Sequence, residues 1–372
     1  MSKRLKCVTP VDGSVYATRR LASGKEIEAA LASARSAQRA WAATPAAERA
    51  RLIDRATDAF VAKGPEIAKE ISWQMGRPAG QTPSEVRGFE ERARHMAKIA
   101  PQALGPIEVE PKDGFKRFIS RDPLGLVFVV APWNYPYLTA VNAVVPALLA
   151  GNAVILRHSA QTPLCAERFA EASAAAGLPK GLFQFLHLSH AATLKLIGVE
   201  EGPDFVAFTG SVSAGYAVQE AAARRFIGVG LELGGKDPAY VRADANLAHA
   251  IENLVDGAFF NAGQSCCGIE RIYVHQSLYD RFVEGAVALT RQYRLGNPLE
   301  EGTNLGPLVR ASAAEFVRGQ VAEAVAAGAR ALIDPKSFPA DEPGTPYMAP
   351  QIVVGVEHSM RIMSEETFGP AV

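Results

Sequence analysis

Two adjacent cysteines, Cys266 and Cys267, are the first residues in the chain that suggest chemistry. They follow Gly263-Gln264-Ser265 and precede a strand-like run at 269–274. Such a junction can hold a nucleophile, because the thiolate is the reactive form and backbone N–H groups can lower the thiol pKa from about 8.5. Free cysteines are more often small buried hydrophobes, so this stretch alone favours a structural role.

Glu232 is a carboxylate that stands between two apolar side chains, Leu231 and Leu233. An acid in apolar surroundings has a raised pKa and can act as a general base. The alternative is an ordinary ion pair with Lys236, and the sequence leaves both possibilities open.

The segment 208–215 carries Gly210 and Gly215 where a strand is expected to end and a helix to begin. Glycine lets the backbone approach a phosphate, and a helix N-terminus offers unpaired N–H groups to an anion. The spacing matches neither the dinucleotide fingerprint nor a nucleotide-hydrolysing P-loop, so a plain turn with a helix cap is equally compatible.

Asn134 follows an apolar run at 126–130. Its amide could donate a hydrogen bond to an oxyanion, although asparagine before a helix more often serves only as a cap. Asn134 is therefore a candidate that needs support from the rest of the chain.

The elements that must position these residues alternate between buried strands and helices. We expect strands at 126–130, 153–156, 183–186 and 205–208 and helices at 136–149, 163–176 and 189–198. This order predicts an α/β fold with a parallel, doubly wound, Rossmann-like sheet. Such a sheet binds ligands at the carboxyl ends of its strands.

Further elements are expected before and after these strands in the sequence. Ser23 is predicted to cap a first helix. Beyond it we expect helices at 45–62, 65–74 and 83–100, a hairpin at 107–121, and a second α/β domain from Gly234, with strands near 238–242, 270–275, 330–333 and 350–356 and helices near 246–259, 277–292 and 311–327.

The composition excludes several classes of partner and site. In the 372 residues, 39 basic side chains balance 39 acidic ones, which argues against nucleic-acid or membrane partners. The four cysteines form no C-x-x-C pair, so we expect neither a disulfide framework nor a metal. No signal peptide or long apolar span is evident, and we expect a cytoplasmic protein.

Five ordered motifs together resemble the aldehyde dehydrogenase superfamily, of the hydrolytic, non-acylating type. They are the Pro-Trp-Asn-x-Pro element at 132–136, Phe-Thr-Gly-Ser at 208–211 with Gly215, Glu-Leu-Gly-Gly-Lys at 232–236, Asn-x-Gly-Gln-x-Cys at 261–266, and Glu-Glu-x-Phe-Gly-Pro at 365–370. The resemblance covers nearly the whole chain in register.

The resemblance implies an enzyme that oxidises an aldehyde to a carboxylic acid with NAD(P)+. Cys266 would form a thiohemiacetal whose oxyanion is held by the Asn134 amide, and Glu232 would activate the water that hydrolyses the resulting thioester. One alternative is a truncated, catalytically inactive family member that acts as a structural or binding protein. Another is a thioester hydrolase that uses Cys266 and Glu232 without a redox cofactor.

The resemblance also implies a binding site for NAD or NADP. Its residues would be Ala131, Pro132, Trp133, Arg157, Ser159, Ala160, Phe208, Gly210, Ser211, Gly215, Leu233, Glu366 and Phe368. Most members carry Lys where Arg157 stands, and NAD-preferring members often carry Glu where Ala160 stands. An added Arg without an acid should tolerate a 2′-phosphate, so we predict dual NAD/NADP use.

The implied substrate tunnel is lined by Tyr135, Thr139, Asn142, Ser265 and Cys267. Members specific for succinate semialdehyde carry Arg at the Asn142 position, and no aromatic box for a quaternary ammonium is evident. We therefore expect a neutral aldehyde of modest size. We also expect Cys266 to be exposed, to have a low pKa and to be inactivated by peroxide.

The resemblance divides the chain into a cofactor-binding domain (1–104 and 123–233), an oligomerisation hairpin (105–122) and a catalytic domain (234–372). The hairpin implies a homodimer or a homotetramer. Family members continue beyond the element at 365–370, so we expect the sequence to be a fragment of a longer enzyme.

Overall fold

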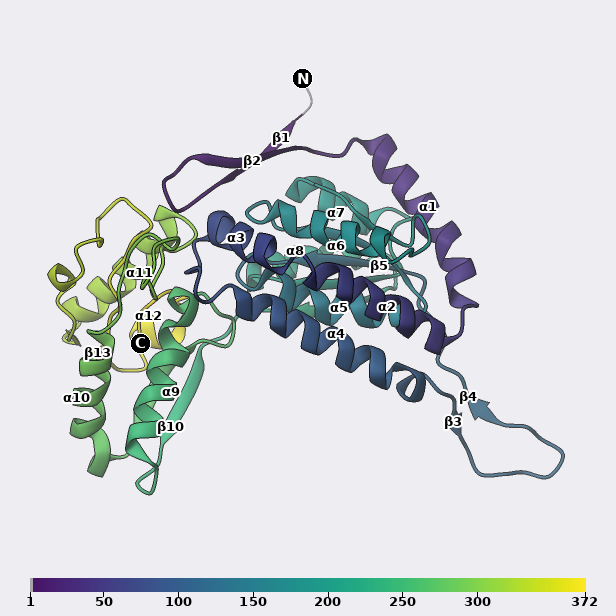
Figure 1. The fold of residues 1–372 in the computed structure, drawn as a ribbon. Helices are drawn as coiled ribbons and strands as arrows, with labels where there is room; N and C mark the ends of the chain where they lie inside the picture. The colour runs from purple at the N-terminus through teal and green to yellow at the C-terminus, as the bar shows by residue number, and fades with distance from the viewer. Residues whose placement is uncertain (1–2) are drawn as a thin grey trace. The chain divides into compact units, whose positions relative to one another are not determined.

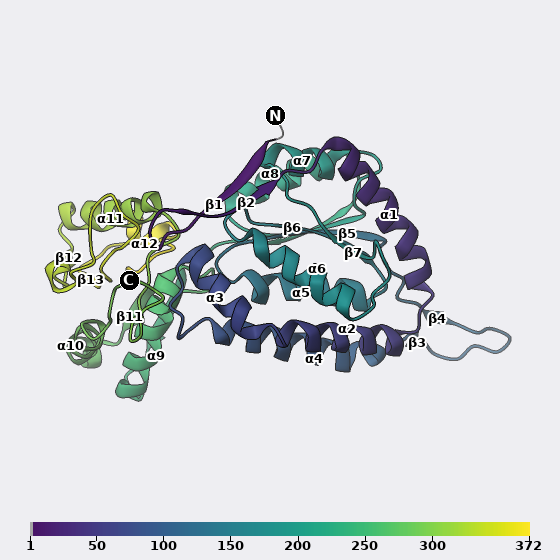
Figure 2. The same cartoon turned by 45° about the horizontal axis from the view of Figure 1, so that its top comes forward.

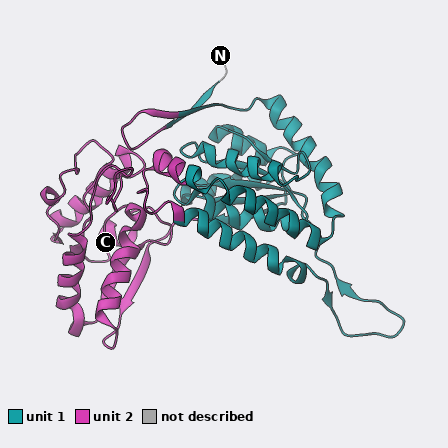
Figure 3. Ribbon diagram, in the orientation of Figure 1, with its two compact units in different colours: residues 1–7, 17–67, 84–232 teal, residues 8–16, 68–83, 233–372 magenta. Residues whose placement is uncertain are grey.

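A computed structural model describes residues 3–372, which form two compact units. Unit 1 contains the N-terminal residues up to Cys7 together with 17–67 and 84–232 (Figure 3). Unit 2 contains 8–16, 68–83 and 233–372. The segments 8–16 and 68–83 thus group with the second half of the chain. The domains expected from the sequence (1–104 with 123–233, 105–122 and 234–372) are functional domains, and they stay a prediction.

A five-stranded sheet forms the centre of unit 1, with strand order β7-β6-β5-β8-β9. Every neighbouring pair is parallel, as predicted. The strands are β5 (Leu126–Ala131), β6 (Ala153–His158), β7 (Phe183–Phe185), β8 (Phe205–Thr209) and β9 (Gly228–Glu232). The sequence did not predict β9, because Gly228 and Gly230 interrupt its apolar pattern.

Helices cover both faces of this sheet (Figures 1 and 2). The helices α1 (Gly24–Ala42), α7 (His190–Gly198) and α8 (Val212–Ala222) lie on one face, and α2 (Ala46–Val61), α5 (Pro136–Leu149) and α6 (Pro163–Ala175) on the other. β5 and β6 are buried along their whole length, since helices lie above and below them. The α/β, doubly wound fold class is therefore confirmed.

A local signal in the sequence sets the start of α1. Ser23 caps α1 and forms a capping box with Glu26, as its spacing predicts. The other N-terminal elements are β1 (Arg4–Val8), β2 (Val15–Arg20), α3 (Gly64–Met75) and α4 (Pro83–Ala103), and the hairpin is the antiparallel pair β3 (Ile107–Glu108) and β4 (Phe118–Ile119).

Unit 2 is built around a parallel pair of strands, β10 (Asp237–Val241) and β11 (Ile269–Val274), connected through the helix α9 (Leu247–Phe259). Its remaining elements are the 3₁₀ turns η1 (Phe260–Gly263), η2 (Gln276–Leu278) and η3 (Pro335–Ser337), helices α10 (Tyr279–Thr290), α11 (Ala311–Ala326) and α12 (Arg361–Ser364), and the short antiparallel pair β12 (Arg330–Ala331) and β13 (Val353–Val354). Phe259, Val255 and Phe282 are buried members of one of its apolar clusters. Within residues 3–372, no helix has the length and apolarity needed to cross a membrane.

A buried carboxylate fixes the start of α5, the helix that follows Asn134. Glu85 is fully buried, and its Oε1 accepts hydrogen bonds of 2.9 Å from the N–H groups of both Tyr137 and Leu138. Pro136 opens the helix and has no N–H to satisfy. Glu85 therefore caps α5 from another helix and opposes the positive end of the helix dipole.

We expect Glu85→Ala to lower the free energy of unfolding by about 2 kcal/mol, because two buried N–H groups lose their acceptor. Urea denaturation measures this quantity. Glu91→Ala, at an exposed position of α4, is the control and should change stability by less than about 0.5 kcal/mol. Equal effects of the two substitutions would refute the capping role.

Candidate active site

The carboxyl edge of the unit 1 sheet brings together the candidates that the sequence placed after separate strands. Asn134 follows β5, Arg157 and Ser159 lie at the end of β6, Gly210 follows β8, and Glu232 ends β9. All these strands are parallel, so their carboxyl ends share one edge. The Gly210 N–H donates to the Glu232 carbonyl oxygen at 3.0 Å, which joins two of these segments directly.

The turn at the start of α8 has the geometry of an anion site. Ser211 caps the helix by accepting a hydrogen bond from the Ala214 N–H at 3.3 Å. A side chain at Gly210 would meet the Phe208 ring at 2.7 Å, so only glycine fits against that ring. The first N–H groups of the helix have no partner within it, and they suit a phosphate.

Arg157 is a cation buried in the last part of β6, with 8% of its surface exposed. Burial lowers the pKa of its guanidinium, and its Nε has no hydrogen-bond partner among residues 3–372. A buried guanidinium with an unused donor favours an anionic or hydroxyl-bearing ligand. The arrangement fits the adenosine end of a dinucleotide.

Glu232 differs from its predicted setting. Its side chain is exposed, because neighbouring residues of a strand point to opposite faces and Leu231 and Leu233 therefore do not enclose it. The expectation of an apolar environment around Glu232 is wrong. The alternative ion pair does not form either, since Lys236 Nζ lies 2.7 Å from Glu270 Oε2.

The turn before Cys266 has a left-handed backbone at three consecutive residues. Asn261, Ala262 and Gly263 have φ values of 55°, 54° and 70°. Left-handed backbone at alanine is unfavourable by roughly 1 kcal/mol, so contacts must hold it. Asn261 and Gln264 exchange side-chain to carbonyl hydrogen bonds of 3.2 and 3.1 Å, and Gln264 Oε1 accepts from the Val309 N–H at 2.8 Å.

Arg77 supports this turn from a distant part of the chain. It is 1% exposed, and its Nε–H donates to Asn261 Oδ1 at 3.1 Å. A side chain at Gly263 would collide with the carbonyl of Gly369, so the turn packs directly against the 365–370 element. Sequence reasoning missed Arg77, because its only local signal is a Gly-Arg-Pro break between two helices.

Both cysteines are exposed, as expected for Cys266, and neither forms a disulfide. The thiol pKa of Cys266 is nevertheless raised, first by partial desolvation of the sulfur and then by the Cys267 thiol and by Glu366. The predicted low pKa is therefore wrong, and the protein alone stabilises the thiol form. Ser265 is buried beside the pair, with its Oγ 3.3 Å from Cys267 Sγ.

Glu270 holds the backbone of the 365–370 element. Its buried carboxylate accepts hydrogen bonds from the N–H groups of Thr367 at 2.8 Å and Phe368 at 2.9 Å, and pairs with Lys236. Phe368 has a φ of 51°, which this double acceptor helps to fix. Nothing in the sequence singled out Glu270, because Glu270 and Arg271 stand side by side in this strand and their types do not show which of them is buried.

Glu366 is half-buried and interacts electrostatically with both Cys266 and Glu270. Burial and the neighbouring Glu270 carboxylate raise the pKa of Glu366. Its Oε1 is buried and has no partner among the described residues, and a side chain at Gly234 would collide with it. An acceptor of this kind fits the hydroxyl groups of a ribose.

The remaining candidates for the substrate tunnel and the cofactor site differ in how far they are exposed. Tyr135 and Thr139 are half-buried at the start of α5, where the Thr139 hydroxyl donates to the Tyr135 carbonyl at 2.7 Å. Asn142 is exposed, and its Oδ1 accepts from Arg92 Nη1 at 3.1 Å. Of the other cofactor candidates, Ala131 is buried, Gly215 is buried in α8, and Pro132, Trp133, Ala160 and Leu233 are half-buried.

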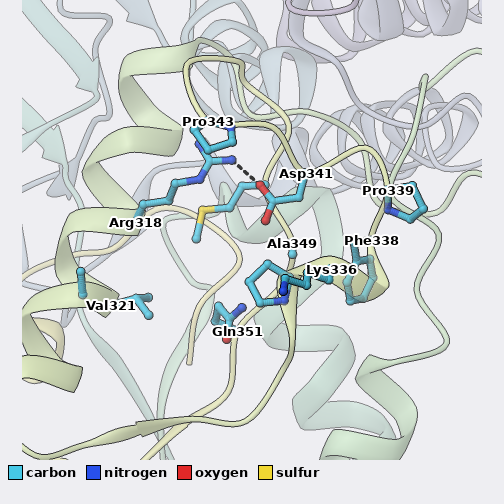
Figure 4. A pocket seen from close by; sticks show the side chains of 12 residues that line it. Arg318, Val321, Lys336, Phe338, Pro339, Asp341, Pro343, Ala349 and Gln351 are labelled. Carbon is cyan, nitrogen blue, oxygen red and sulfur yellow. Dashed lines mark hydrogen bonds and ion pairs between the residues drawn. The ribbon is translucent and has the colours of Figure 1, made fainter.

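A cavity of about 560 Å³ lies in unit 2, apart from these candidates (Figure 4). Its walls are mostly apolar, and Arg318 pairs there with Asp341 at 2.5 Å. None of the 12 lining residues is a predicted site residue.

We expect the rate of alkylation of Cys266 by iodoacetamide, without cofactor, to keep rising with pH beyond about 8.5, because only the thiolate reacts and its pKa is raised. Mass spectrometry of the peptide that contains Cys266 measures the rate, and Cys267→Ser removes the competing thiol. A rate that is already constant below pH 8 would contradict the raised pKa.

Comparisons of the sequence with a family model and with curated proteins point to the same family. A model of the aldehyde dehydrogenase family matches residues 1–372. The chain is 33% identical to a Mycobacterium ulcerans protein named "Putative succinate-semialdehyde dehydrogenase [NADP(+)] 2", over 97% of this chain and 69% of that protein.

Solved structures agree with this result. An NADP-dependent enzyme of E. coli superimposes with a TM-score of 0.94 at 29% identity, over 99% of this chain and 76% of the other. An NAD-dependent aldehyde dehydrogenase of Sinorhizobium meliloti has a TM-score of 0.92 at 32% identity, over 100% and 74%. The predicted enzyme class and nicotinamide cofactor class are confirmed, and the chain belongs to the aldehyde dehydrogenase family.

Proposed function

We propose that this protein oxidises an aldehyde to a carboxylic acid with NAD or NADP through a covalent intermediate on Cys266. The observation that carries the proposal is the exposed Cys266 thiol on a left-handed turn held by Asn261, Gln264 and buried Arg77. A rigid turn of this kind suits a nucleophile, because it fixes the direction of attack.

In the proposed reaction, Cys266 Sγ bonds to the aldehyde carbon while the C=O π bond breaks, and the thiol proton passes to solvent water. The Asn134 amide and the Cys266 backbone N–H donate to the resulting oxyanion. A nicotinamide ring held through its ribose by Glu366 and Phe368 would supply the acceptor for the hydride of this carbon. Glu232 then takes a proton from water, whose oxygen bonds to the thioester carbon. The C–S bond breaks, the acid leaves, and the Cys266 sulfur stays on the enzyme as the thiolate. The exposure of Glu232 gives its carboxylate access to water.

Two buried polar atoms of the chain have no hydrogen-bond partner among residues 3–372 and suit the groups of a dinucleotide. Arg157 Nε offers an unused donor, and Glu366 Oε1 offers an unused acceptor. We propose that Arg157, Ser159 and Ala160 hold the adenosine ribose, and that Trp133 and Leu233 also contact the cofactor. The turn at 210–215 would hold the pyrophosphate, and Glu366 and Phe368 the nicotinamide ribose.

The substrate class has two candidates. A neutral aldehyde of modest size follows from the absence of a cation at position 142 in the sequence. A carboxylate-bearing aldehyde is favoured by Arg92, whose guanidinium reaches Asn142 from α4 and places a positive charge beside the proposed tunnel residue. The relative from Mycobacterium ulcerans is named for such a substrate.

We also propose that the hairpin at 107–121 joins subunits into a homodimer or homotetramer. Phe115, Phe118 and Ile119 are at least half exposed on it, which is unusual for large apolar side chains on a two-stranded ribbon.

We expect Cys266→Ala to lower kcat by at least about a thousandfold, since the covalent route is lost, and Cys267→Ala to lower kcat/KM by less than about tenfold. The assay is formation of NADH or NADPH from butanal and from succinate semialdehyde. The assignment fails if Cys267→Ala has the larger effect. Cofactor binding by a wild-type protein that oxidises no aldehyde would support the non-catalytic alternative.

We expect kcat/KM for NAD and for NADP to differ by less than about a hundredfold, because Arg157 is near the adenosine end and Ala160 carries no repelling acid. Arg157→Met should lower kcat/KM for NADP by about tenfold or more and that for NAD by less. Arg87→Met, at an exposed position on α4, is the matched control. A preference for NAD above a hundredfold would contradict dual use.

A further inference from the structure

His158 is a buried histidine at the end of β6 whose role no motif suggested. It is 3% exposed and lies next to Ala131 in the register of β5 and β6. Its Nε2 lies 3.0 Å from the Pro136 carbonyl oxygen. Its Nδ1 lies 3.0 Å from both the Ser159 nitrogen and the Thr162 hydroxyl.

These partners assign one tautomer to the ring. The Pro136 carbonyl can only accept, so Nε2 carries the proton, and the Ser159 N–H can only donate, so Nδ1 accepts. A second proton on Nδ1 would face the Ser159 N–H. In keeping with this, burial lowers the pKa of His158 to about 4, and the ring stays neutral at neutral pH.

The two ring nitrogens hold two different segments of the proposed site. Pro136 is the first residue of α5, two positions after Asn134. Ser159 belongs to the segment proposed for the adenosine ribose, and the Thr162 N–H donates to the Ser159 carbonyl at 3.1 Å, which closes that turn. A single side chain therefore connects the oxyanion donor segment to the cofactor segment.

We propose that His158 is a positioning residue that acts on both segments, with Nε2 setting the Asn134 turn for catalysis and Nδ1 setting the 159–162 turn for cofactor binding. The proposal rests on the proposed function of these segments. Glu85 satisfies the first free N–H groups of α5 but not the Pro136 carbonyl, so His158 adds a separate constraint. Each nitrogen should affect a different measured quantity.

Two substitutions separate the two nitrogens. Glutamine places an N–H near the position of Nε2, and asparagine places an oxygen near that of Nδ1. We expect His158→Gln to raise the Kd for NADP by about tenfold while nearly keeping the single-turnover rate at saturating cofactor. We expect His158→Asn to lower that rate by about tenfold while nearly keeping the Kd.

Isothermal titration calorimetry with NADP gives the Kd, and stopped-flow formation of NADPH from butanal gives the rate. His187→Gln is the matched control, because His187 is also buried in unit 1 but its Nε2 contacts Glu167 at 3.2 Å, and it should change neither quantity. Thr162→Val removes one hydroxyl from Nδ1 and should raise only the Kd, which provides a test if the histidine variants fold poorly.

Parallel losses of affinity and rate in both histidine variants, or no loss in either, would overturn the proposal. A wild-type protein that binds NADP but oxidises no aldehyde would overturn the proposed function instead, and the calorimetric effects of His158→Gln and Thr162→Val would still decide whether Nδ1 sets the cofactor segment.

Discussion

Parallel pairing of β5 with β6 and β8 is the constraint on which the site of unit 1 depends. Both faces of β5 and β6 are covered by helices, so these strands can be continuous apolar runs. Parallel strands bring their carboxyl ends to one edge, and the register opposes Ala131 to His158 and Thr209 to Glu232. The polar residues at and just beyond the ends of these strands therefore lie along one edge, although they are far apart in the sequence.

In unit 2, buried polar side chains, and not the ends of a sheet, hold the candidate site residues in place. Arg77 and Glu270 are both buried, and each binds backbone or amide groups of a segment that departs from ordinary backbone geometry. Removing one partner of such a contact leaves the other buried and unsatisfied, which costs more than the contact itself contributes. Residues 261–263 and Phe368 can keep their left-handed backbone because several of these hydrogen bonds act on it at once.

Local patterns predicted most of the fold and only part of the site. Apolar runs and the Ser23 cap defined β5, β6 and α1, whereas β9 was missed because its glycines hide the strand pattern. The motifs identified the candidates, but the environment of each depended on residues far away in sequence. Lys236 pairs with Glu270 and not with Glu232, and the pKa of Cys266 is raised by burial first and also by the distant Glu366.

The neutral His158 beside Arg157 shows why the type of each polar group matters at this edge. A protonated imidazole would add a second positive charge next to a guanidinium that burial already destabilises, and Arg157 itself contributes to the lowered pKa of His158. With the His158 ring neutral, the Arg157 guanidinium is the cation at this position that can bind an anionic ligand. The same ring can then use one nitrogen as a donor and the other as an acceptor, a combination that lysine and arginine, which have no acceptor, cannot provide.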